Sequence, residues 1–271
     1  MIRLYDILAA VWQNHRTDKF ISNGLIIGFI TGLILVVGNR LFEIPWLSSS
    51  VNYFLAIDIA FQILLIIEIL GLIFILPKSV ADSMGKQFEI LSIILLRSAF
   101  KEFGKFSHPV EWSNIVYEPL FHMLSDAFGA LLIFLIIGVY YKKQLHTKIT
   151  ETKKEQEEFI SFKKVLAIIL LGFFVYLGAG DLIDFIQTGS YVDSFNAFYT
   201  ALIFMDILIL LFSLRYSSKY YNLFRYSSFA FATILIRVAL TAPAYTNIFL
   251  GVTAGLFVLG LTITYNHFMK P

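Results

Sequence analysis

Four ionisable residues lie inside strongly apolar stretches of the chain: Glu68, Arg97, Asp206 and Arg237. Glu68 stands in "IIEILGLIFI" at 66–75, where every other residue is apolar or glycine. A charge at the centre of a bilayer costs about 2.5–3.5 kcal/mol on insertion scales, so such residues pair with one another or line a path for ions. The four residues therefore predict either ion pairs or an ion route.

The spacing indicates which of these residues pair. At 1.5 Å per helical residue, Glu68 lies roughly 12 Å from one end of its apolar stretch, and Arg97 lies roughly 13–14 Å from the same side. Asp206 and Arg237 lie at similar depths in the second half of the chain. We therefore expect the pairs Glu68–Arg97 and Asp206–Arg237. Two interpretations stay open: structural ion pairs between neighbouring helices, or parts of an ion or proton path.

Three further residues are candidates for such a path: Asp58, His122 and Asp126. His122 and Asp126 are four residues apart, so they share one face of a helix. Histidine titrates near neutral pH, and a carboxylate beside it favours the imidazolium form. The pair therefore predicts a proton-accepting site, and the alternative is a polar cluster near the lipid headgroups.

The composition is typical of a polytopic membrane protein. Hydrophobic residues make up 58% of the 271 residues and charged residues 15%, with a mean hydropathy of +0.76. Soluble proteins have about 45–50% apolar and about 25% charged residues. The chain has no cysteine, which excludes disulfides and thiolate metal sites. No H-E-x-x-H, G-x-S-x-G or phosphate-loop pattern occurs, so we expect no enzyme and no nucleic-acid partner.

Apolar runs of bilayer length predict the helices that position the charged residues. We predict an all-α integral membrane protein with eight spans, at about 20–38, 51–76, 88–100, 119–141, 165–180, 195–214, 226–242 and 245–265. Alternating spans leave only Arg40, Lys101 and Lys105 on one side of the membrane. Apart from Arg97 and Arg237, which fall within spans, the remaining basic residues lie on the other side. Because the basic side faces the cytoplasm, both termini are expected there, in a cell (inner) membrane.

Two segments outside the spans are distinct in sequence: one is amphipathic and the other is highly charged. Before the first span, Leu4, Leu8, Val11 and Trp12 fall on one helical face, which is typical of an interfacial helix. A charged stretch in the middle of the chain predicts a cytoplasmic linker. We therefore divide the chain into an interfacial helix (1–19), a first four-helix repeat (20–141), a linker (142–164) and a second four-helix repeat (165–271).

The two four-helix parts resemble each other in sequence. "ILLRSAF" at 94–100 corresponds to "ILIRVAL" at 234–240, and Glu68 corresponds to Asp206 at nearly the same offset. Matches in one order at a nearly constant offset predict an internal duplication. Since each copy has an even number of spans, the copies would share one orientation, related by an axis along the membrane normal.

Asp58 and Glu68 lie ten residues apart on one face of a helix, and "GKQFEILSIILL" follows with an acid beside an aromatic residue. In these features 54–97 resembles the second and third helices of the voltage-sensor domains of cation channels. The resemblance implies that Asp58 and Glu68 are outer and inner countercharges and that Glu89 is the third-helix acid. The fourth helix of that family carries regularly spaced arginines, whereas 119–141 has no basic residue. We therefore expect no working voltage sensor.

Three glycines follow one another at intervals of four: Gly24, Gly28 and Gly32. Small residues at this spacing let two helices approach closely in lipid. The stripe predicts contact with another protomer in a homo-oligomer, and the alternative is close packing within the chain's own bundle.

The intramembrane charges favour an ion- or proton-permeable channel or transporter whose partners are the lipid bilayer and small cations or protons. The alternative is a non-catalytic subunit or scaffold of a larger membrane complex. A membrane enzyme or redox protein has the least support. No cofactor or metal is expected, because only His122 of the five histidines falls within a span, and haem in a bundle needs histidines at facing depths.

Overall fold

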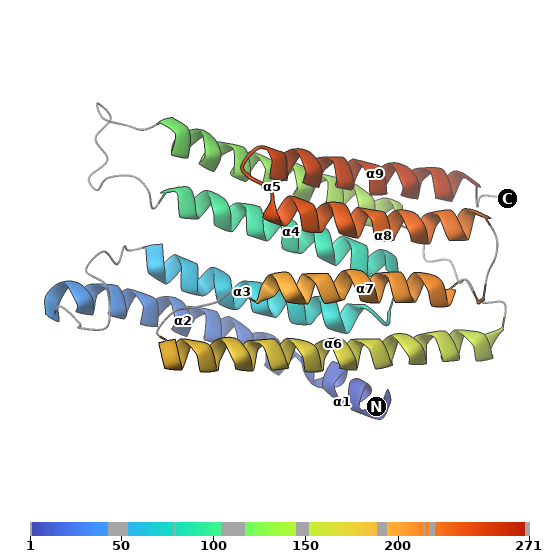
Figure 1. Ribbon diagram of the computed structural model, residues 1–271, viewed down its shortest axis with the longest axis horizontal. Coiled ribbons are helices and arrows are strands. Elements are labelled where there is room, and N and C mark those ends of the chain that lie inside the picture. The colour runs from blue at the N-terminus through green and yellow to red at the C-terminus, as the bar shows by residue number, and fades with distance from the viewer. Residues whose placement is uncertain are drawn as a thin grey trace.

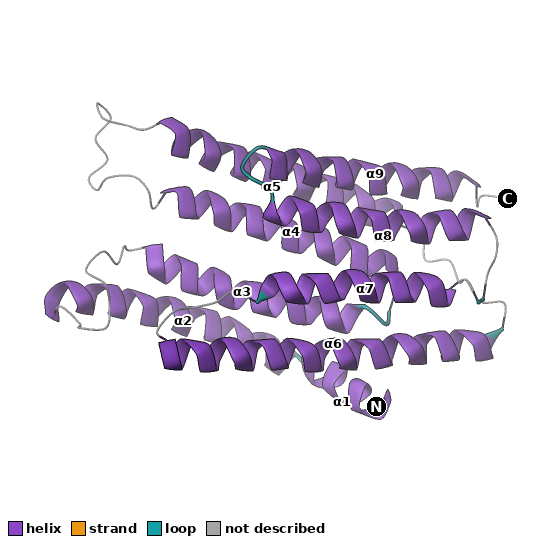
Figure 2. Cartoon of the chain, viewed as in Figure 1, coloured by secondary structure: helices purple, strands orange, loops and turns teal. Residues whose placement is uncertain are grey.

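The computed structural model of the protein describes residues 2–42, 54–78, 80–103, 117–144, 152–188, 194–213, 215–216 and 220–268. The described residues form helices joined by short turns, and no strand occurs among them (Figure 2). The helices are α1 (Ile2–Trp12), α2 (His15–Phe42), α3 (Phe54–Ile75), α4 (Val80–Phe103), α5 (Tyr117–Lys143), α6 (Lys153–Thr188), α7 (Phe195–Ser213), α8 (Tyr220–Thr241) and α9 (Thr246–Phe268). The all-α expectation is confirmed.

Six of these helices are long and apolar enough to cross a membrane: α2, α5, α6, α7, α8 and α9. Helix α3 carries a shorter apolar stretch, Ile59–Ile75, and α4 does not meet this criterion because charged residues are spread along it. The structure therefore agrees with a multi-pass membrane protein, and membrane crossing by α3 and α4 remains a prediction.

Two expected boundaries are corrected. The third span was predicted at 88–100, but α4 already begins at Val80, because polar residues in its first two turns are helical as well. The charged stretch 142–164 is not a linker throughout, since α6 begins at Lys153 and continues into the apolar run without a break. Residues 145–151 lie outside the part of the chain that the structure describes.

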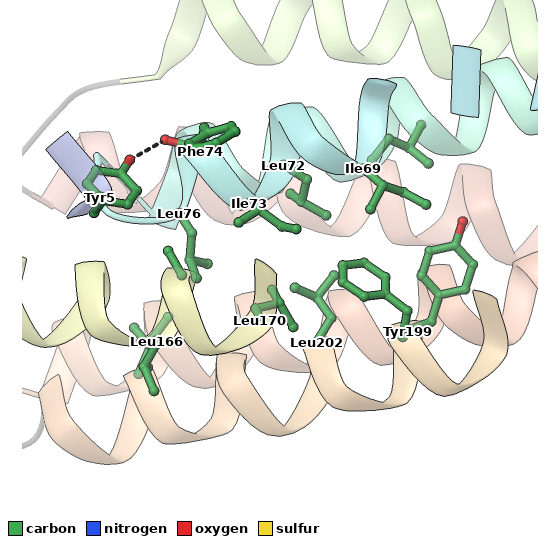
Figure 3. Packing of buried hydrophobic residues seen from close by; sticks show 14 of the residues in the cluster. Tyr5, Ile69, Leu72, Ile73, Phe74, Leu76, Leu166, Leu170, Tyr199 and Leu202 are labelled. Carbon is green, nitrogen blue, oxygen red and sulfur yellow. Dashed lines mark hydrogen bonds between the residues drawn. The ribbon is translucent and has the colours of Figure 1, made fainter. Parts of the chain in front are cut away.

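The long helices run roughly side by side and build two hydrophobic cores (Figure 1). We call the cluster built by α1, α3, α6 and α7, with one residue of α4, the first core. The cluster built by α4, α5, α8 and α9 is the second core. Ile69, Leu170 and Leu202 are almost completely inaccessible in the first core (Figure 3), as is Ile133 in the second. Each core thus combines helices from both halves of the sequence.

The order in which helices pack is similar in the two halves of the chain. In both halves each helix packs against the next along the chain, from α2 to α5 and from α6 to α9. Contacts between the halves include α4 with α8 and α5 with α9, which would be corresponding helices in the predicted duplication. The division into two repeats remains a prediction, because shared cores do not by themselves demonstrate a duplication.

Helix α4 is the least apolar of the helices at the centre of the bundle, and it is also well enclosed. It packs against α3 on one side and against α5, α8 and α9 on the others. Met84, Phe88, Leu91 and Leu95 turn into the second core, and Ile90 reaches the first. Ionisable residues in membrane proteins face the interior of the bundle, so an enclosed helix is where polar side chains are best tolerated.

Helix α1 packs against α6 and α2 at the end of the bundle that also holds the end of α9 (Figure 1). The Tyr5 hydroxyl donates a hydrogen bond of 2.7 Å to the carbonyl oxygen of Phe74 in α3 (Figure 3). Leu8 and Trp12 pack on the first core, whereas Leu4 and Val11 are exposed. The predicted single apolar face is therefore divided between the protein and the surroundings.

The glycine stripe of α2 faces α3 of the same chain. A Cβ added at Gly32 would lie 2.7 Å from the Cα of Ala56, and one at Gly28 would clash with Ile63. Nothing lies within 4 Å of a Cβ built at Gly24. Gly28 and Gly32 thus pack closely within the bundle, as the alternative interpretation had it, and contact of the stripe with another protomer stays a prediction.

Candidate functional site

The cation on Glu68 is Lys86, not Arg97 as the sequence predicted. The Lys86 ammonium forms an ion pair with the Glu68 carboxylate and a second one, of 2.9 Å, with Glu89 Oε2. The Tyr141 hydroxyl of α5 donates a hydrogen bond of 2.7 Å to the other oxygen of Glu89. Side chains from α3, α4 and α5 thus form one charged cluster, which we call the Lys86 cluster.

The helical hairpin of α3 and α4 explains this correction. Glu68 lies seven residues before the end of α3, and Lys86 lies six residues after the start of α4, so the two come side by side. Arg97 lies eleven residues further along α4, roughly 16 Å away at 1.5 Å per residue. The predicted depth of Arg97 was measured from residue 88, whereas the helix begins at Val80.

Gly85 lets the phenol ring of Tyr141 reach this cluster. A Cβ built at Gly85 would lie 2.5 Å from the Tyr141 hydroxyl oxygen, which is closer than real Cβ atoms approach other atoms. The missing side chain therefore makes room for the hydrogen bond between Tyr141 and Glu89. We expect any larger residue at this position to displace Tyr141.

Asp206 in α7 has a neutral hydrogen-bond donor. The amide nitrogen of Gln87 in α4 donates to Asp206 Oδ2 at 3.3 Å. Thr233 of α8 is a second polar neighbour of this carboxylate. Leu202 and Ile209, on the same helix as Asp206, belong to the first core, whereas Thr233 lies beside Met84 of the second core. Asp206 therefore lies where the two cores meet.

Arg237 attracts Asp206 but does not form the expected close pair with it. The two groups interact electrostatically, yet within the described residues no ion pair of 4.0 Å or less joins them. The Arg237 guanidinium lies over the ring of Tyr199 instead, with its Cζ atom 4.3 Å from the ring centroid. The residue is 6% exposed, and none of its three guanidinium nitrogens has a hydrogen-bond partner among the described residues.

His122 and Asp126 share a helix but have different partners. Asp126 is 2% exposed and accepts a hydrogen bond of 3.0 Å from the amide of Asn247 in α9. The Nδ1 atom of His122 lies 4.0 Å from Glu102 Oε2 of α4, and its ring meets Tyr245 edge to face. His122 and Asp126 therefore belong to two separate polar contacts between helices. The sequence analysis did not single out their partners, Glu102 and Asn247.

The remaining site predictions have these outcomes. Glu89, implied as the third-helix acid, belongs to the Lys86 cluster. Arg97 is half-buried on α4. The side chain of Asp58 lies outside the described residues, so its predicted role as an outer countercharge stays a prediction. Within the described part of the chain, no group of three metal-ligating side chains is present.

Sequence reasoning missed Lys86 and Gln87, the two α4 residues that hold the acids of α3 and α7. These neighbours lay before the predicted span and therefore counted as loop residues. The helical spacing of Met84, Phe88, Leu91 and Leu95 would have indicated a helix that includes both residues. No hydropathy rule identifies Asn247 or Tyr199, because their roles depend on which helices pack together.

The chain was compared with protein-family models, with curated proteins and with solved structures, and no match was found in any of the three comparisons.

Proposed function

We propose that this chain is a multi-pass membrane protein that transports protons or small ions, with Asp206 as the carboxylate that exchanges the transported proton or cation. The observation that carries the proposal is the hydrogen bond from Gln87 to Asp206 at the boundary of the two cores. An acid in the middle of an apolar helix is a functional candidate by default. The contact also joins α4 of the first half to α7 of the second.

The partners of Asp206 support exchange better than those of Glu68. Protonation of Glu68 would give up its close ion pair with Lys86. Asp206 is held by the amide of Gln87, and Arg237 rests on Tyr199 rather than on the acid. Protonation of Asp206 would therefore break no ion pair of 4.0 Å or less among the described residues.

Polar groups on both sides of Asp206 support a route along α4. Towards one end of this helix lie the Lys86 cluster and Asp82, which accepts a hydrogen bond of 2.6 Å from Gln144. Towards the other end lies Glu102, which meets His122. Since α4 is enclosed by neighbouring helices, transported protons or ions would pass through the bundle interior and not along the lipid.

The proposal is tested in liposomes that contain the purified protein and a pH-sensitive dye. An imposed membrane potential should drive a proton flux, and Asp206→Asn should lower that flux at least tenfold. Asp181→Asn is the matched control, because it makes the same exchange at a half-buried acid that also accepts hydrogen bonds, in this case from Ser194. It should retain most of the flux. If Asp206→Asn retains the flux, Asp206 is not the exchanging group.

The same liposomes test the alternative role as a non-catalytic membrane subunit. Gradients of sodium or potassium, measured with dyes specific for each ion, test the transport of small cations. No flux of any of these ions above that of empty liposomes, from protein with an intact helical spectrum, would contradict the transport proposal. The subunit alternative would then be preferred.

A further inference from the structure

The guanidinium of Arg237 is buried in the bundle without hydrogen-bond acceptors among the described residues. Its Nε, Nη1 and Nη2 atoms are buried and have no hydrogen-bond partner among the described residues. A guanidinium carries five N–H donors in a fixed planar arrangement and keeps its charge in proteins. A buried charged group without hydrogen bonds is costly, and structures normally satisfy it.

The ring of Tyr199 covers one face of the Arg237 guanidinium. Tyr199 lies below its plane, with 4.3 Å between Cζ and the ring centroid, and a cation–π contact of this kind involves the face and not the N–H edge. The nearest acid, Asp206, is held by Gln87 and lies beyond ion-pair distance. The edge that carries the N–H groups therefore still requires acceptors.

We propose that the N–H edge of Arg237 binds a small monovalent inorganic anion, of the size of chloride or nitrate, between α4, α7 and α8. The site consists of Arg237 as the cation, Tyr199 as the platform on one side and Gln87 with Thr233 as polar neighbours beside Asp206. A single fixed positive charge matches one negative charge. Leu202, three residues after Tyr199 in α7, and Ile236, next to Arg237 in α8, are fully buried, and such close packing restricts the ligand to a small one.

The proposal goes beyond the transport of protons or cations proposed above, and the two are linked through charge. Arg237 and Asp206 together are neutral when the acid is ionised, so a bound anion then meets repulsion from Asp206. Neutralising Asp206 leaves the guanidinium as the only charge at this point, and an anion should then bind more tightly. Asp206→Asn reproduces the neutral acid without a change of pH.

Binding is measured on the wild-type protein in detergent by the line width of the ³⁵Cl nuclear resonance, which broadens when chloride exchanges with a protein site. We expect excess broadening that nitrate removes in a saturable manner and that gluconate, which is too large, leaves unchanged. The melting temperature should rise with chloride compared with gluconate at equal sodium concentration. No removable broadening and equal melting temperatures in the two salts would overturn the proposal.

Variants locate the site. Arg237→Gln should remove the nitrate-sensitive broadening, and Asp206→Asn should lower the chloride concentration at half-saturation severalfold. Arg225→Gln is the matched control, because Arg225 also lies over a tyrosine, with Cζ 4.4 Å from the Tyr265 ring centroid. An equal loss in Arg225→Gln and Arg237→Gln, or weaker binding in Asp206→Asn, would contradict the assignment. Because the wild-type result needs no variant, a misfolded Arg237→Gln does not prevent the test, and binding in detergent is independent of transport.

Discussion

Glu68 and Asp206 occupy corresponding positions in the predicted duplication, yet the partners of the two acids differ in charge. Neighbouring residues of one α4 turn reach them: Lys86 forms an ion pair with Glu68 in α3, and Gln87 donates a hydrogen bond to Asp206 in α7. Successive residues of a helix point about 100° apart, so α4 can serve a helix on each side. A charged partner holds the first acid, whereas the second acid accepts a hydrogen bond from a neutral amide, as the proposed exchange at Asp206 requires.

The different partners of Glu68 and Asp206 also bear on the roles of Arg97 and Arg237. The ammonium of Lys86 balances two acids in the first half, so Arg97 is not the partner of Glu68. In the predicted duplication Tyr226 takes the place of Lys86, and its side chain carries no positive charge. Arg237 is therefore the nearest cation to Asp206, although it rests on Tyr199.

The largest effect on stability should come from the Lys86 cluster. Lys86→Met leaves Glu68 and Glu89 without their cation in a mostly buried position, and we expect the free energy of unfolding to fall by about 3 kcal/mol. Titration with dodecyl sulfate in detergent, followed by circular dichroism, measures this change.

Two variants control for the loss of a lysine at Lys86. Lys164→Met makes the same exchange at a pair whose acid, Asp6, is exposed. The two groups lie 2.6 Å apart, and the change should lower stability by about 0.5 kcal/mol or less. Adding Glu68→Leu to Lys86→Met should restore part of the loss, because it removes an unpaired charge. A loss in Lys164→Met as large as in Lys86→Met would contradict a buried, structural Lys86 cluster.

A smaller effect should come from Gln87, whose bond to Asp206 involves only one charged group. Gln87→Leu leaves the Asp206 carboxylate without its amide donor and should cost about 1–2 kcal/mol of stability. A double-mutant cycle with Asp206→Leu should show a coupling of about 1 kcal/mol, since the two side chains are in contact. Additive effects of the two changes would show that the hydrogen bond contributes nothing to stability.

The smallest effect should come from Tyr5, which ties α1 to the end of α3 near Glu68. Tyr5→Phe removes the hydrogen bond to the Phe74 carbonyl and should cost about 1 kcal/mol, measured by the same titration. Burial, with a smaller contribution from Asp6, raises the pKa of Tyr5 from 10.0 to about 12. Because the folded pKa lies above the unfolded one, this stabilisation should be complete below pH 10 and disappear between about pH 10 and 12. A wild-type protein that loses the α1 contact already at pH 9 would contradict this contact.

The membrane class and most helices could be predicted because apolar runs of bilayer length are a local property of the sequence. Helices α5, α7, α8 and α9 lie close to the predicted spans 119–141, 195–214, 226–242 and 245–265. Helix α4 was predicted too short, since hydropathy treats polar residues at a helix start as loop. The chain also places apolar residues such as Met84 and Phe88 at helical spacing through that polar region, and this periodicity was the better signal.

The sequence by itself determined that Glu68, Asp206 and Arg237 would stand in apolar helices and would need partners, because residue type and local hydropathy settle the cost of a buried charge. Only the tertiary structure decided which partners they have. Lys86 meets Glu68 because the α3–α4 turn sets the register of the hairpin, and Gln87 meets Asp206 because α4 packs where the two cores join. Such contacts depend on the packing of helices far apart in the chain, which local patterns do not encode.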